Sequence, residues 1–347
     1  MIAALSPSPA RGGAEVYNKD ELSLELGLRL QPRMELSGTS TGRGWQRDFL
    51  IRRSRLKANG KVHRAKYVVE WKIDSTDQIG ASPSAAIENC YLQYPLGWEM
   101  DLRVGLYDQP FSRDRLTSDS KQLAVDRGAV SDIPAALGLA DNAFGLQLQG
   151  EVREGRAQYA VGLFDNRTIP GQLQVIPMAV GRLDLNFGSS KDVYRDAHFG
   201  DQKWFSIGLN GSYQGGIENA AGARDGSTAA AGVDGMVDVP IRSGRLLARG
   251  EFNNVQLTDP AGGNSVDTRM WMAGLGILLF HQRFQPIVRF DQVLLDDAVG
   301  GGSRNITYAG ANFYQDGHKL KVQGDIRFEA GTQYAVDGGR LQAQVDF

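Results

Sequence analysis

Residues 20–31 read Asp20-Glu21-Leu22-Ser23-Leu24-Glu25-Leu26-Gly27-Leu28-Arg29-Leu30-Gln31, and they carry the clearest alternating pattern in the chain. Leucine occupies every second position from Leu22 to Leu30, and the positions between are polar or glycine. Residues two apart share a face only in a β-strand. The stretch therefore predicts a strand with one apolar face and one polar face.

The same alternation recurs along the chain, for example in residues 65–74, 100–107, 319–329 and 340–347. Many of these segments reach the roughly 9–11 residues that a tilted membrane strand needs, whereas strands of globular proteins more often have about five or six. We therefore predict an all-β fold, a transmembrane antiparallel β-barrel of about sixteen strands. It is closed by pairing the first strand (Asp20–Leu36) with the last (Arg340–Phe347), because an open edge in lipid leaves backbone groups without partners. Seven side chains are predicted to face lipid: Tyr67, Trp71, Leu102, Val104, Ile326, Phe328 and Val345.

The links between the predicted strands alternate between short and long. Asn59–Val62 and Pro95–Trp98 are short, whereas Ser75–Ala85 and Asp108–Asn142 are long and polar. Such alternation is typical of a barrel with tight turns at one rim and loops at the other. Gly188–Gln202 breaks the rule, because a long link stands where a short turn is due. Either the strand count slips there or that turn carries an insertion.

Bulk composition excludes several classes of protein. The net charge of −2 over 347 residues gives no electrostatic basis for binding nucleic acid. A mean hydropathy of −0.32 suits a soluble protein, but also a barrel in which only alternate residues meet lipid. The single cysteine, Cys90, excludes an intrachain disulfide and a zinc site built from several cysteines, and we expect a buried, inert thiol.

The first fourteen residues differ from the rest. Met1–Ala14 is rich in small residues and proline, and Ala14 before Glu15 suits a signal-peptide cleavage site. We expect a signal-peptide remnant or a disordered start here, followed by a single barrel domain over residues 15–347.

Three segments of the first half resemble one family. Pro110-Phe111-Ser112-Arg113-Asp114-Arg115-Leu116-Thr117-Ser118, followed by Val125–Gly128, and the arginine-rich strand Phe49–Leu56 are similar to the phosphate-selective porins of the O and P type. The resemblance implies a Gram-negative outer-membrane porin, through which small hydrophilic solutes diffuse in a water-filled channel. It also implies a third extracellular loop, Asp108–Asn142, folded into the lumen, and a homotrimer in lipid and lipopolysaccharide. The terminal Phe347 would be read by the barrel assembly machinery.

The long loop supplies the candidate site. We expect Arg113, Arg115, Lys121 and Arg127 to border the narrowest part of the channel, facing Arg53, Arg55 and Lys57 of the wall. Cations and carboxylates nearly balance on the inward faces, so the expected anion preference is mild and phosphate-like. The alternative is that the loop arginines pair with Asp114, Asp119 and Asp126 and merely hold the loop in shape.

Other functions find little support. The four histidines are scattered and no His-Glu-x-x-His motif occurs, so we expect no catalytic residues, no metal and no cofactor. A second hypothesis is that the barrel is a sleeve around a periplasmic or extracellular partner, such as an electron-transfer protein. A lumen filled by a bound protein would favour that alternative.

Overall fold

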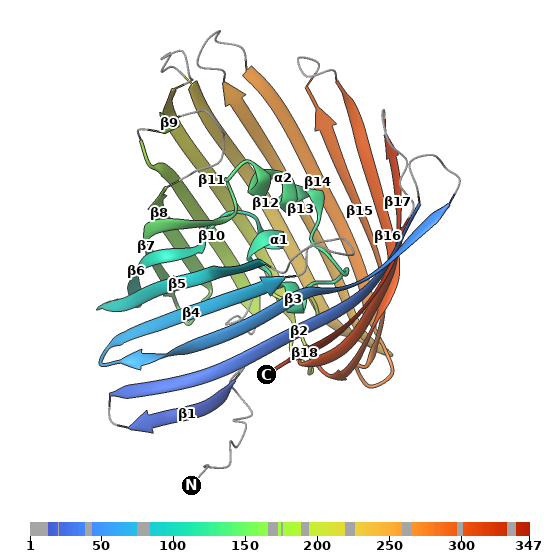
Figure 1. Cartoon of the computed structure of the whole chain (residues 1–347), viewed down its shortest axis with the longest axis horizontal. Helices are drawn as coiled ribbons and strands as arrows, with labels where there is room; N and C mark the ends of the chain where they lie inside the picture. The colour runs from blue at the N-terminus through green and yellow to red at the C-terminus, as the bar shows by residue number, and fades with distance from the viewer. Residues whose placement is uncertain are drawn as a thin grey trace.

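The computed structural model describes residues 13–19, 21–38, 44–74, 84–165, 173–174, 176–188, 194–218, 226–258, 265–296, 301–331 and 338–347. These residues form one antiparallel sheet that curves around a central space (Figure 1). Residues 1–12, most of the expected leader, lie outside the described part.

Sixteen strands make the barrel wall in the described ranges, as predicted. They are β2 (Leu22–Gly38), β3 (Trp45–Val62), β4 (Ala65–Asp74), β5 (Ser84–Gly97), β6 (Met100–Asp108), β7 (Asn142–Val152), β8 (Ala157–Phe164), β10 (Met178–Gly188), β11 (Trp204–Glu218), β12 (Gly226–Ile241), β13 (Gly244–Thr258), β14 (Ser265–Leu278), β15 (Phe284–Leu295), β16 (Gly302–Asp316), β17 (Leu320–Gly331) and β18 (Gly338–Asp346). Two further short strands, β1 (Ala14–Lys19) and β9 (Leu173–Gln174), pair with β2 and β11.

The barrel closes where the sequence predicts. β18 pairs with β2 from Gly338 opposite Ser37 to Asp346 opposite Arg29. At the end of the chain Leu28 and Phe347 exchange two backbone hydrogen bonds of 2.8 and 3.0 Å. β1 then takes over the same edge of β2, so the N-terminal strand continues the line of the C-terminal one. Closure satisfies the backbone groups that a free edge would expose to lipid.

The wall is apolar outside and polar inside, the reverse of a soluble protein. On β11, Phe205 and Leu209 are exposed on the outer face while Ser206 and Gln214 are buried on the inner face. The seven predicted lipid-facing residues all lie on the outer face. Five of them are exposed, and Tyr67 and Leu102 pair across the ladder with the exposed outer residues Leu92 and Tyr94.

Exposed outer aromatic residues gather toward both ends of the wall. Near the short turns lie Tyr94, Trp98, Phe187, Phe205, Phe280, Phe313 and Phe347, and nearer the long loops lie Phe49, Phe144, Tyr213, Phe252 and Phe328. Two such girdles mark the two interfaces of a membrane. No helix in the described ranges is long and apolar enough to cross a membrane.

The two rims differ as expected. The turn between β5 and β6 is tight, with Trp98 and Glu99 at φ of 53° and 57°. Two successive residues with positive φ are typical of a type I′ turn, whose twist matches that of the flanking strands. We call this end the short-turn rim and the opposite end the long-loop rim.

One sequence prediction about the wall is wrong. Cys90 is exposed, not buried, and it pairs across the ladder with Leu106 of β6. It shares the outer face with Leu92, so its thiol points away from the lumen. The physical reason is that the outer face of a barrel meets lipid and has no protein layer to cover it.

Candidate functional site

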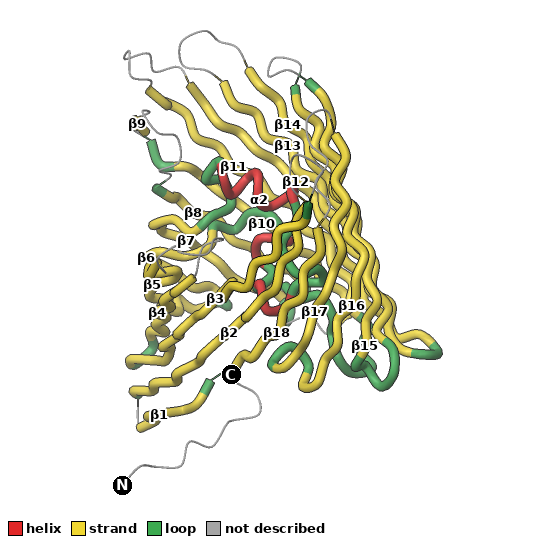
Figure 2. The backbone as a smooth tube through the Cα atoms, turned by 45° about the vertical axis from the view of Figure 1, so that its right-hand side comes forward, coloured by secondary structure: helices red, strands yellow, loops and turns green. Residues whose placement is uncertain are grey.

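The link between β6 and β7, residues 109–141, lies inside the barrel (Figure 2). This inward loop contains α1 (Arg113–Leu116), a 3-10 turn (Asp119–Lys121) and α2 (Ala129–Ala136). Ser112 begins α1, and its hydroxyl accepts a hydrogen bond from the backbone N–H of Arg115 at 3.2 Å. Such a cap satisfies one of the free donors of the first turn. The prediction of an inward-folded long loop is confirmed.

An apolar core joins one side of the inward loop to the wall. Phe111, Val130 and Leu139 of the loop are fully buried and pack with Val255 of β13 and Met270 of β14. Burial of each such side chain contributes roughly 1.5–3 kcal/mol. The loop is thus held in place by packing over the wall from β10 to β16.

Buried ion pairs fix the first turn of the loop. Arg113 lies 2.5 Å from Asp234 of β12 and 3.2 Å from Asp184 of β10, and all three side chains are almost fully buried. The next residue, Asp114, pairs with Arg249 of β13. Removing one member of a buried pair leaves an uncompensated charge, so each pair strongly resists displacement of the loop.

The middle of the loop is tied to the other side of the wall. Asp126 pairs with Arg33 of β2 at 2.8 Å and with Arg340 of β18 at 2.7 Å. Asp119 pairs with Arg53 of β3 at 2.6 Å. Burial alone would raise the pKa of Asp119, but Arg127 and Arg53 outweigh it and hold that pKa below its usual value.

The structure places the loop cations of the predicted site among carboxylates. Arg113 faces Asp184 and Asp234 of the wall. Arg127 lies 2.5 Å from Asp119, one of the partners proposed for it in the alternative holding role. Arg115 contacts Asp141 and lies 3.5 Å from Asp108. Lys121 is half-buried, and its backbone carbonyl accepts a hydrogen bond from Asp196.

The three wall residues of the predicted site divide in a similar way. Arg53 pairs with Asp119, and Arg55 lies 3.5 Å from Glu88 and 3.9 Å from Glu70. Lys57 alone of the seven lines the cavity described next.

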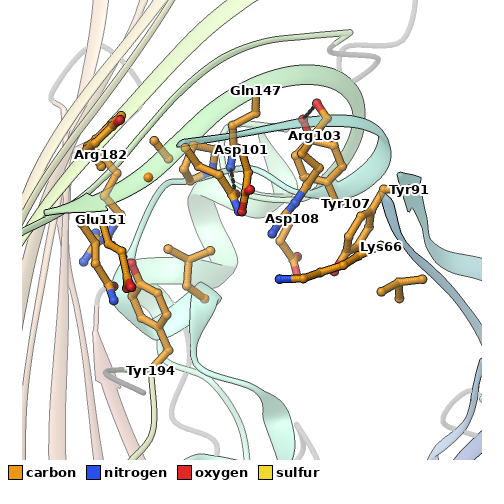
Figure 3. A pocket seen from close by; sticks show the side chains of 18 of the residues that line it. Lys66, Tyr91, Asp101, Arg103, Tyr107, Asp108, Gln147, Glu151, Arg182 and Tyr194 are labelled. Atoms are coloured by element: carbon orange, nitrogen blue, oxygen red, sulfur yellow. Dashed lines mark hydrogen bonds between the residues drawn. The ribbon is translucent and has the colours of Figure 1, made fainter. Parts of the chain in front are cut away.

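The remaining lumen lies against β3–β8 and extends to Arg182 and Asp184 of β10, beside the ion pair of Arg113. It contains a cavity of about 690 Å³. Lys66, Asp101, Arg103, Gln147 and Glu151 reach it from the wall, and Pro110 and Leu116 border it from the inward loop. In Figure 3, Arg103, Tyr107 and Asp108 lie on one side of the cavity and Arg182, Glu151 and Tyr194 on the other.

Arg103 is held rigidly at the cavity wall. Its guanidinium carbon lies 4.6 Å from the ring centre of Tyr91 and 5.2 Å from that of Tyr107. Its Nη2 donates to Gln93 at 2.9 Å. Two aromatic rings and an amide orient a planar cation without neutralising its charge.

Unpaired charges of both signs line this cavity. Within the described residues, Lys57, Lys66 and Arg103 have no carboxylate at ion-pair distance, and neither Asp101 nor Glu151 faces a cation at that distance. A second hollow of about 770 Å³ lies at the short-turn rim, and Lys57, Lys66 and Val68 line both. The two spaces therefore meet at the two lysines.

The long link Gly188–Gln202, between β10 and β11, stands where a short turn is expected. In the described residues the barrel has the predicted sixteen strands, so this link is an insertion at the short-turn rim and not an error in the strand count. Its described part, residues 194–203, enters the lumen from that rim, and Asp196, Ala197 and His198 are buried. Tyr194 lines the cavity. Sequence reasoning noted the length of this link but not its inward course, because no residue pattern marks a turn that folds inward.

No cluster of metal-ligating side chains occurs among the described residues. Sequence reasoning also omitted Lys66 and Arg103 from the site. Their inward direction follows from strand alternation, but the absence of an ion-pair partner depends on side chains from neighbouring strands.

Comparisons with known proteins agree with this architecture. The anion-selective porin from Comamonas acidovorans superposes with a TM-score of 0.70 at 12% identity, covering 94% of this chain and all of that one. The DcaP channel of Acinetobacter baumannii gives 0.64 at 10% identity, with 95% and 99% covered. OmpT of Vibrio cholerae in its trimer form gives 0.64 at 10% identity, with 94% and 100% covered. At these identities the likeness shows the fold alone.

No curated protein sequence matches the chain. The sequence profile of the phosphate-selective porin O and P family matches residues 24–204, just over half of the chain. The match spans β3–β8, which border the cavity, and the whole inward loop. In such barrels the short turns face the periplasm and the long loops face outside. The protein is a channel of the Gram-negative outer membrane, not an enzyme, and it belongs to the phosphate-selective porin O and P family.

Proposed function

We propose that small hydrophilic solutes cross this porin along the wall of β3–β8, and that the path mildly favours anions such as phosphate. The observation that carries the proposal is the set of unpaired cations on that wall. Lys57, Lys66 and Arg103 line the cavity without ion-pair partners in the described part of the chain. Most other arginines of the lumen are already neutralised by carboxylates.

The preference is mild because carboxylates border the same space. Asp101 and Glu151 line the cavity, and Glu99 is exposed at the rim. A charge at a wide, water-filled mouth is screened within about 8 Å at physiological salt. A fixed charge deeper in a low-dielectric passage acts more strongly, because field lines are focused there. Arg103 therefore outweighs Glu99 in setting selectivity.

For the loop arginines we propose the holding role. The role of Arg113, Arg115 and Arg127 is to hold the inward loop in place, so they affect the solute path indirectly. Lys121 and Lys57 act directly on solutes in the path through their charge. Arg53 and Arg55 of the wall act with the first group, because carboxylates of the loop and of β4 and β5 face them.

The test is the reversal potential of the purified porin in planar bilayers across a salt gradient. We expect the wild type to prefer chloride to potassium, and the double variant Lys66→Gln/Arg103→Gln to shift toward cations. Arg269→Gln is the control, because Arg269 is exposed on the outer face of β14 and its substitution removes a positive charge outside the lumen. An unchanged reversal potential in the double variant would refute the proposal that ions cross the channel past Lys66 and Arg103.

The sleeve hypothesis has less support. Residues 109–141 and 194–203 of the chain itself occupy much of the lumen, which leaves a cavity of about 690 Å³ where a partner protein would have to pass. Solutes of small-molecule size fit that space, and a folded protein does not.

The remaining partners follow from family membership. We propose that the barrel assembles as a homotrimer in a bilayer with lipopolysaccharide, that Phe347 is read by the assembly machinery, and that a leader ending near Ala14 is removed before the barrel domain of residues 15–347. Cross-linking of the protein in outer-membrane vesicles tests the trimer, and mass spectrometry of the mature chain tests its start.

A further inference from the structure

The inserted turn between β10 and β11, described over residues 194–203, is built into the lumen and is not a loose periplasmic loop. His198 stacks on Trp204 with ring centres 4.0 Å apart, and its backbone N–H donates to Asp238 at 2.7 Å. Arg245 of β13 donates to the carbonyls of Gly200 and Gln202 at 2.5 and 2.8 Å. These polar contacts, buried at His198 and part-buried at Arg245, hold the turn at one position on the inner wall.

Asp196 connects this turn to the inward loop from the opposite rim. Its carboxylate accepts a hydrogen bond from the backbone N–H of Leu123 at 2.7 Å, and its own N–H donates to the carbonyl of Lys121 at 2.8 Å. The same carboxylate lies 2.7 Å from Arg249, which also pairs with Asp114 at the start of the loop. One buried side chain thus joins the turn, the wall and both parts of the loop.

Tyr194 brings the turn to the edge of the cavity. Its hydroxyl donates to Asp184 at 2.6 Å, and its ring centre lies 5.7 Å from the guanidinium of Arg113 and 5.5 Å from that of Arg182. Figure 3 places Tyr194 next to Glu151 and across the cavity from Tyr91. The turn therefore lines the same space that the loop borders.

We propose that the turn is the second element of the constriction, with Tyr194 as a lining residue that limits solute size and Asp196 as the positioning residue that holds the tip of the inward loop. The inference rests on the proposed path along β3–β8. A loop that enters from one rim and a turn that enters from the other meet at Lys121–Leu123, and together they confine solutes to one side of the barrel.

Asp196→Ala is the first test. It removes both side-chain contacts and frees the loop tip, so we expect a higher mean conductance, more current noise and passage of larger neutral sugars in liposome swelling. Asp201→Ala is the matched control, because Asp201 belongs to the same turn and is exposed. Equal conductance and an equal sugar size limit in Asp196→Ala and wild type would overturn the positioning role.

Asp196→Asn separates positioning from folding. It retains an acceptor for the Leu123 N–H but loses the charge that faces Arg249, so we expect a smaller change in the same direction. Heat-modifiable mobility on gels confirms that each variant is a closed barrel. If both variants fold and neither alters conductance or size limit, the proposal is wrong.

Tyr194 is tested by two substitutions. Tyr194→Ala should raise the size limit for sugars, and Tyr194→Phe should leave that limit unchanged while shifting the reversal potential toward cations, because Asp184 loses a hydrogen-bond donor. An unchanged size limit in Tyr194→Ala would remove Tyr194 from the constriction. The size limit for neutral sugars does not depend on Lys66 or Arg103, so failure here is distinguishable from failure of the proposed anion preference.

Discussion

Arg113 of the inward loop and Asp234 of β12 are 121 residues apart in the sequence, and their side chains meet with Nε and Oδ1 at 2.5 Å. Both side chains are almost completely buried, and Asp184 and Arg182 complete the cluster. The charge of Arg113 therefore fixes the inward loop to the wall through ion pairs. The charges that act on solutes are those left without partners on the opposite wall.

Replacing Arg113 with methionine should release the first part of the loop. The substitution keeps an apolar side chain of similar length but leaves Asp184 and Asp234 with Arg182 as the remaining cation, and breaking such a buried pair typically costs about 3–5 kcal/mol. We expect a lower urea midpoint in gel-shift unfolding and a higher, noisier single-channel conductance. The double variant Arg113→Met/Asp234→Asn should recover part of the stability, as a double-mutant cycle would measure.

Arg52→Met is the control for that prediction. The side chain of Arg52 is 35% exposed and lies 3.7 Å from Asp126, so its ion pair is screened by water and contributes little. If Arg52→Met and Arg113→Met lower the urea midpoint equally, the buried cluster is not what holds the loop.

Strand alternation was sufficient to predict the barrel. Leu22–Leu30 predicts the first strand, and the polar face of Lys319–Glu329 predicts that Lys321 and Asp325 point inward, where they are buried. The pattern works because the period of two is local and depends only on the pleat. The length of the link Asp108–Asn142 likewise predicts a special role for this segment.

The partners of the inward charges could not be predicted in the same way. Whether Arg113 faces solute or Asp234 depends on where the loop settles, and that position is set by Phe111, Leu139 and distant strands. Arg103 and Arg53 look alike in the sequence, yet Arg103 meets two tyrosines and Arg53 meets Asp119. Selectivity in such a lumen is a property of the pairing pattern and not of the number of arginines.

Cys90 provides a test of the orientation of β5. Its thiol is exposed on the outer face beside Leu92, so in the membrane it should meet lipid. A lipid-soluble maleimide should label the reconstituted protein, and a charged, membrane-impermeant maleimide should label it only after unfolding. Lys319→Cys in a Cys90→Ser background is the control, because residue 319 is exposed at the short-turn rim and both reagents should reach it. Rapid labelling of Cys90 by the impermeant reagent would place β5 in the opposite orientation.

Deleting Phe347 should impair barrel closure. Its backbone forms the last two hydrogen bonds with Leu28, at 2.8 and 3.0 Å, before β1 takes over the edge of β2. Each unsatisfied backbone group in lipid costs several kcal/mol. We expect less heat-modifiable barrel in the outer membrane and more material in the periplasm, measured by fractionation and gel mobility. Phe347→Tyr keeps the backbone and the aromatic ring, so it should give wild-type levels of folded barrel. If the deletion also gives wild-type levels, the two hydrogen bonds between Leu28 and Phe347 are not needed for closure.

Lys121 predicts how the channel responds to pH. Burial, with Arg195 and Arg29 nearby, lowers the pKa of Lys121 to about 8, while Asp346 acts in the opposite direction and Lys57 adds a further positive charge. The lysine is therefore mostly charged at pH 7 and mostly neutral at pH 9. Because it lies near Lys57, its neutralisation should reduce the anion preference between these two values, measured as the reversal potential in a salt gradient.

The lowered pKa of Lys121 also predicts how the free energy of unfolding changes with pH. The pKa of Lys121 is lower in the folded barrel than the ordinary value of 10.5, so between about pH 8 and 10.5 the unfolded chain binds more protons. The contribution of Lys121 to the free energy of unfolding should therefore rise with pH across that window, and Lys121→Met should remove both the rise and the selectivity step. Lys319→Met is the control, since Lys319 is exposed at the short-turn rim. A selectivity step that persists in Lys121→Met would assign it to another group and remove Lys121 from the solute path.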